Sequence, residues 1–97
     1  MGDRVMSIVI ELPTTLRPFA SGEAQVALND HASFNEALDS LIARHPRLKS
    51  RLVTGSGTVY DFVSVFVNDR RVGPDEFPEI TLGDGDVVTL VPAMAGG

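Results

Sequence analysis

The sequence predicts an α+β fold, with one main helix packed across one face of a mixed sheet of four to five strands. Two observations lead to this prediction. Apolar residues alternate with other residues over residues 7–12 and again over residues 62–67, and a capped amphipathic helix lies between these segments. The 97 residues, of which 43% are hydrophobic, provide enough apolar side chains for one core and too few for two. One domain is therefore expected.

The first two strands are expected to form a hairpin. Strand one covers residues 7–12, because Ile8, Ile10 and Leu12 share one face of an extended chain. Pro13 ends it. A connection with two prolines and a glycine then leads to a shorter second strand near residues 24–28.

The helix is expected over residues 34–45. Ser33 followed by Glu36 forms a capping box. The apolar residues that follow recur at helical spacing and need a sheet to pack on. They are Phe34, Ala37, Leu38, Leu41 and Ile42. Pro46 stops the helix, and one further helical turn is expected over residues 48–53.

The last strands begin at residues 62–67, which alternate again. Asn68 and Asp69 tolerate turn dihedrals, so the chain is expected to fold back into a short fourth strand near Val72. The next segment, "GPDEFPEI", is interpreted as irregular.

The turn "GDGD" precedes a final strand over residues 87–91, which is apolar on both faces and is therefore expected inside the sheet. The order strand, strand, helix, then three strands matches a β-grasp, in which the last strand lies centrally beside the first.

Charge and composition exclude several functions. The formal net charge is −5, with 13 acidic and 8 basic residues, which disfavours nucleic acid and favours an electropositive protein partner. Arg17, Arg70 and Arg71 are interpreted as a scattered set that aids solubility. The chain has no cysteine, which fits a reducing, cytoplasmic location. We expect no signal peptide and no membrane span.

The residues also argue against catalysis and metal binding. His31 precedes the helix and His45 ends it, where the helix dipole explains a histidine. "TGSGTV" lacks the lysine of a phosphate-binding loop, and "GDGD" lacks the remaining ligands of a calcium loop. No catalytic residue, bound metal or bound cofactor is expected.

The chemistry is expected at the carboxyl end, in a flexible tail of residues 92–97 that follows a domain of residues 1–91. Two glycines in the last two positions have a random frequency of about 0.5%. Glycine lacks a Cβ, so it can pass through a narrow slot in another protein. The terminal carboxylate is a poor electrophile, which ATP-dependent adenylation by a partner enzyme would activate for attack by a sulfur donor.

Three stretches give the sequence a resemblance to the MoaD/ThiS family of ubiquitin-like sulfur carriers over residues 5–97. They are "LPTTLRPFA", "VFVNDRRV" and "LGDGDVVTLVPAMAGG". The resemblance implies a β-grasp that is not itself an enzyme. It also implies that an ATP-dependent activating enzyme adenylates Gly97, that the adenylate is then converted to a thiocarboxylate that donates sulfur, and that Gly96 passes the narrow slot. The flexible approach would be formed by Pro92, Ala93, Met94 and Ala95.

The resemblance leaves the pathway open. The chain is most similar to the cysteine-biosynthesis (CysO-like) subtype, whose sulfur passes to a biosynthetic acceptor enzyme. The alternatives are a carrier for thiamine or another sulfur-containing metabolite, the small subunit of molybdopterin synthase, a modifier that forms isopeptide bonds, and a β-grasp interaction module without sulfur chemistry. A monomer is expected when the protein is free. Phe66 is the candidate residue for a partner surface, if it lies on the open face of the sheet.

Overall fold

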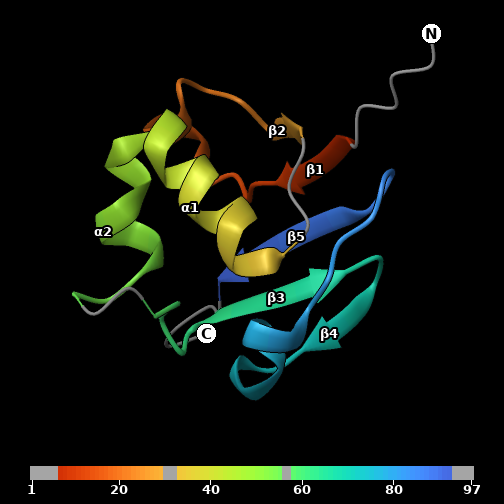
Figure 1. Ribbon diagram of the computed structural model, residues 1–97. Coiled ribbons are helices and arrows are strands. Elements are labelled where there is room, and N and C mark those ends of the chain that lie inside the picture. The colour runs from red at the N-terminus through yellow and green to blue at the C-terminus, as the bar shows by residue number, and fades with distance from the viewer. Residues whose placement is uncertain (1–6, 30–32, 56–57, 93–97) are drawn as a thin grey trace, which may run out of the picture.

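A computed structural model of the chain describes residues 7–29, 33–55 and 58–92. It contains a five-stranded sheet with the strand order β2-β1-β5-β3-β4. Figure 1 shows the helices α1 and α2 together on one side of this sheet, which confirms the predicted β-grasp arrangement. The strands are β1 (Ser7–Glu11), β2 (Gln25–Asn29), β3 (Val63–Val67), β4 (Arg70–Val72) and β5 (Val87–Pro92), and the α-helices are α1 (Phe34–Arg44) and α2 (Lys49–Leu52).

The last strand lies at the centre of the sheet, as predicted. β5 runs parallel to β1, with Val9 opposite Val87, and antiparallel to β3, with Val67 opposite Val88. The β1–β2 and β3–β4 pairs are antiparallel hairpins. The β3–β4 turn has positive φ angles of 50° at Asn68 and 73° at Asp69, which these two residue types tolerate better than most.

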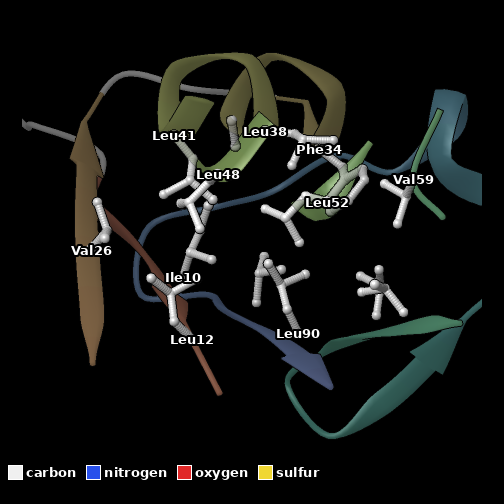
Figure 2. Packing of buried hydrophobic residues seen from close by; sticks show 14 of the residues in the cluster. Ile10, Leu12, Val26, Phe34, Leu38, Leu41, Leu48, Leu52, Val59 and Leu90 are labelled. Carbon is white, nitrogen blue, oxygen red and sulfur yellow. The ribbon is translucent and has the colours of Figure 1, made fainter. Parts of the chain in front are cut away.

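The core lies between the sheet and the helices. Buried and less buried side chains alternate along β1, β2 and β5, and the buried ones face α1 and α2. In Figure 2, Leu41 of α1 and Leu52 of α2 point toward the sheet, where Ile10 and Leu90 meet them. The described residues contain no buried polar or charged side chain, so burial of apolar surface is the main source of stability.

Helix α1 begins where the sequence predicts. Ser33 has an extended backbone, and its Oγ accepts a hydrogen bond of 3.0 Å from the N–H of Glu36. This bond satisfies one of the N–H groups that a helix start leaves without an intrahelical partner. The helix ends at Arg44, with His45 as its C-cap.

The substitution Ser33→Ala is expected to lower the free energy of unfolding by about 1 kcal/mol, because it removes the acceptor at the N-cap. Urea denaturation followed by circular dichroism measures this loss. Ser33→Asp is the matched control, since aspartate also caps helices, and it should stay close to the wild type. An unchanged Ser33→Ala variant would show that the cap contributes no stability.

Residues 74–79 differ from the sequence prediction. The segment interpreted as irregular forms a 3-10 helix, η3 (Pro74–Glu79). Glu76 organises its start, because Oε2 accepts a hydrogen bond of 2.9 Å from the N–H of Gly73 and Oε1 lies 3.3 Å from Nη1 of Arg70. The two prolines in this segment argued against a helix, but Pro74 lies in the first turn, where proline is well placed.

Glu76 gives the fold a dependence on pH. The hydrogen bond from the N–H of Gly73, and then the Arg70 guanidinium, lower the pKa of its carboxyl from the ordinary value of 4.5. A lowered folded-state pKa stabilises the protein above the unfolded-state pKa, and this stability is lost as the pH falls through the folded-state pKa. Glu76→Gln cannot titrate. The wild type should therefore have a higher free energy of unfolding than this variant near pH 5, and the difference should decrease as the pH is lowered to about 3. Denaturation midpoints of both proteins across this pH range measure the difference. A difference that stays constant with pH would contradict a lowered pKa of Glu76 in the folded state.

Candidate functional site

Strand β5 carries the tail that the sequence singles out. Pro92 was expected in the tail, but it is the last residue of β5 and lies opposite Val63 of β3. Proline fits there because the β1 pairing ends at Thr89, so one edge of β5 has no partner at Pro92. The strand therefore continues one residue beyond the boundary expected from the sequence.

The other predicted residues of the tail lie outside the described residues. They are Ala93, Met94, Ala95, Gly96 and Gly97. His31 also lies outside them.

The opposite end of β5 is fixed by side chains of the "GDGD" turn and of the β3–β4 hairpin. Asp86 accepts hydrogen bonds from the N–H of Gly83 (2.7 Å) and from the side-chain amide of Asn68 (2.8 Å). The Oδ1 of Asn68 accepts one from the N–H of Val87 (2.9 Å), and Asp84 accepts one from the N–H of Ser7 (2.8 Å). This network ties the start of β5 to both neighbouring strands. The two aspartates thus have a structural role, and the sequence did not indicate that Asn68 takes part.

Phe66 lies on the open face of the sheet, away from the helices. Its neighbours Val65 and Val67 turn toward the core, whereas Phe66 is half-buried opposite Thr89 of β5 and Arg71 of β4. The same face of β5 ends in Val91, whose side chain is 42% exposed. The structure therefore meets the condition on which Phe66 was a candidate, and its role remains a prediction.

A hollow of about 410 Å³ lies at the root of the tail, because Pro92 forms part of its wall. We call it the tail-root pocket. Phe62 is 50% exposed there and stacks on Tyr60 with ring centroids 4.9 Å apart. The pocket is lined mainly by apolar and aromatic groups, with one guanidinium at its edge. Its lining includes Leu16, Phe19, Arg51, Tyr60, Phe62 and Pro92.

Two arginines lie over one wall of this pocket. The guanidinium carbons of Arg51 and Arg47 are 4.4 Å and 5.3 Å from the ring centroid of Phe19. Such contacts hold a cation against an aromatic face. Sequence reasoning missed this group and considered Arg17, Arg70 and Arg71 instead. The available signal was the stretch of residues 44–60, which has four basic residues and no acidic one.

His45 has a structural position. It is the C-cap of α1, its side chain is 10% exposed, and Nε2 lies 3.5 Å from Oε1 of Glu23 without the geometry of a hydrogen bond. No group of three or more metal-binding side chains occurs within residues 7–29, 33–55 and 58–92. No helix in this part of the chain is long and apolar enough to cross a membrane.

Comparison with known proteins gives consistent matches along the chain. The sequence model of the ThiS family matches residues 10–97. The sulfur carrier protein CysO of Mycobacterium tuberculosis is 32% identical over 94 residues, which cover 95% of this chain and 100% of that protein.

Solved structures agree with this match. A chain in the crystal structure of the BexX/CysO complex of Amycolatopsis orientalis has a TM-score of 0.79 and 36% identity, covering 93% of this chain and 99% of that chain. The crystal structure of SAMP1 from Haloferax volcanii has a TM-score of 0.80 and 29% identity, covering 94% of this chain and 99% of that chain. The ubiquitin-like fold is thus confirmed.

Proposed function

The chain belongs to the ThiS family, and we propose that it carries sulfur as a thiocarboxylate on Gly97. It is a ubiquitin-like sulfur carrier, which partner enzymes use as a substrate. In the proposed cycle, an ATP-dependent activating enzyme adenylates the Gly97 carboxylate and releases pyrophosphate. A sulfide-level donor then attacks the acyl-adenylate carbonyl and displaces AMP. The resulting thiocarboxylate passes its sulfur to a biosynthetic enzyme, for which we favour cysteine formation because of the likeness to CysO.

The position of β5 is the observation that best supports this proposal. The strand is central in the sheet, is fixed at its start by Asp86 and Asn68, and ends at Pro92. The five residues that follow can reach about 17 Å beyond the domain when extended. A rigid base with a short, narrow extension suits delivery of Gly97 into the active site of another protein, with Gly96 at the narrowest point.

We propose two further parts of this mechanism. ATP and the sulfur donor belong to the activating enzyme, so the carrier itself needs no cofactor. The open sheet face around Phe66 is a partner surface, because a half-buried aromatic side chain there lies on the strand next to β5. Pro92 starts the approach to the partner, and Ala93, Met94 and Ala95 continue it.

Intact-mass spectrometry tests the proposed function. The purified protein is incubated with ATP, sulfide and the enzyme that activates carriers of the ThiS family. Its mass is then compared with that of a sample without ATP. Replacement of one oxygen by sulfur, located on the C-terminal peptide, is the expected result. No mass change with a demonstrably active activating enzyme that is cognate to this chain would reject the proposal.

A further inference from the structure

The basic residues of this acidic protein are unevenly distributed. Residues 44–60 contain four of the eight basic residues and none of the thirteen acidic ones. Three of them, Arg47, Lys49 and Arg51, are exposed side chains on or just before α2. We call these three the basic patch. The rest of the chain has four basic residues against thirteen acidic ones, so the patch is a local reversal of the overall charge.

The charges of the basic patch are not neutralised within the described part of the chain. In that part, Arg70 forms an ion pair with Glu76 and Nε2 of His45 lies near Glu23, and neither contact includes a residue of the patch. Arg47 and Arg51 instead lie over the ring of Phe19. Stacking holds the guanidinium groups in place and leaves their N–H groups available to carboxylates.

The tail-root pocket adjoins this patch, because Arg51 belongs to both. Its aromatic residue Phe62 is half exposed and stacked on Tyr60. Aromatic rings offer apolar contact area and a guanidinium pairs well with a carboxylate, so this pocket suits an apolar side chain that stands next to an acidic one.

The position of the pocket limits which partner can use it. Pro92 is both a wall of the pocket and the last residue of β5. Gly97 lies five residues further on, within about 17 Å along an extended chain. A protein that holds the Gly97 carboxylate in its active site is therefore close to the pocket and the patch.

We propose that the tail-root pocket and the basic patch form a docking site for the activating enzyme. A segment of that enzyme presents an apolar side chain flanked by carboxylates to this site. This proposal rests on the proposed function, since it names the enzyme that binds the tail. The apolar side chain enters between Phe19 and Phe62, and the carboxylates pair with Arg51 and Arg47. Docking at this site orients the tail before the reaction, and the opposite charges speed association.

Binding of the purified activating enzyme, measured by titration calorimetry without ATP, tests the proposal. Arg51→Glu should weaken binding about tenfold or more, because it places a carboxylate against the acidic segment. Arg51→Lys should recover part of the affinity, since it restores the charge but not the planar guanidinium. Higher salt should weaken wild-type binding more than that of Arg51→Glu.

Arg70→Glu is the matched control. It makes the same change in net charge at another exposed arginine, on the β3–β4 hairpin, and should bind within about twofold of the wild type. Circular dichroism verifies that each variant is folded. Lys49→Glu provides a second reversal inside the patch, if Arg51→Glu does not fold. Equal affinity of the wild type and the patch variants, or no binding of the wild type, would overturn the proposal.

Adding ATP to the same samples separates the two proposals. Adenylation of the wild type with unchanged binding of Arg51→Glu would preserve the proposed function and reject the docking site. The expected binding pattern without adenylation of the wild type would preserve the docking site and reject the proposed function.

Two other occupants of the pocket have their own signatures. A dimer that Arg51→Glu dissociates in sedimentation, with enzyme affinity unchanged, would assign the site to a second copy. A second measurement compares the NMR amide chemical shifts of Phe62 and Arg51 in the full chain and in a chain ending at Pro92. A difference in these shifts would show that the tail occupies the pocket. Either result would overturn docking of the enzyme.

Discussion

A chain extended by a single residue after Gly97 is expected to lose thiocarboxylate formation almost completely. The extra residue moves the reactive carboxylate by about 3.5 Å, and a displacement of about 1 Å can already cost a factor of 10² in an enzyme active site. We expect a loss of at least about 10²-fold in the rate of adenylation. Intact-mass spectrometry after incubation with the activating enzyme, ATP and sulfide measures it.

The extension should leave the stability of the domain unchanged, because the described core ends at Leu90 and β5 at Pro92. Denaturation midpoints provide this control. Gly96→Val should cause a similar loss by filling the narrow slot, whereas the matched change Ala93→Val lies further from the reactive end and should be milder. Normal adenylation of the extended chain would show that activation does not depend on the position of the Gly97 carboxylate, and it would contradict the proposed mechanism.

Replacing Phe34 by alanine is expected to cause the largest loss of stability. Phe34 is 1% exposed and its ring centroid lies 4.8 Å from that of Phe77, so it joins the start of α1 to the 3-10 helix η3. Loss of a buried phenylalanine costs about 3–5 kcal/mol, a large part of the total stability of a domain of this size. Urea denaturation monitored by circular dichroism measures the change.

Phe62→Ala is the matched control, because the chemical change is identical and only the burial differs. Phe62 is 50% exposed and stacked on Tyr60, so its loss should cost about 1 kcal/mol. Equal losses for the two variants would contradict the assignment of Phe34 to the core and Phe62 to the surface. If Phe34→Ala is already unfolded, Phe34→Leu should show a smaller loss in the same direction.

Local chemistry explains which parts of the fold the sequence predicts. The start of α1 depends on Ser33 and the β3–β4 turn on Asn68 and Asp69, and these residues act on the backbone within a few positions of themselves. The alternation along β1 and β3 also follows from their own residues. These elements were predicted correctly because each one contains its own signal.

The missed features depend on side-chain contacts that the periodicity of apolar residues does not show. Glu76 stabilises η3 through Gly73 and Arg70, and no pattern of apolar residues marks such a helix. The tail-root pocket brings together residues as far apart in sequence as Phe19, Arg51 and Pro92. Spacing along the chain says nothing about such a site until the topology of the sheet is known.

The central position of β5 also determines how the protein responds when a partner pulls on the tail. Force applied beyond Pro92 runs along the strand, and it loads the hydrogen bonds to β1 and β3 in shear. Many bonds must then break together, whereas a strand at the edge of a sheet would peel away from a single neighbour. We therefore expect that an enzyme can draw the tail tight, and release it again, while the domain stays folded.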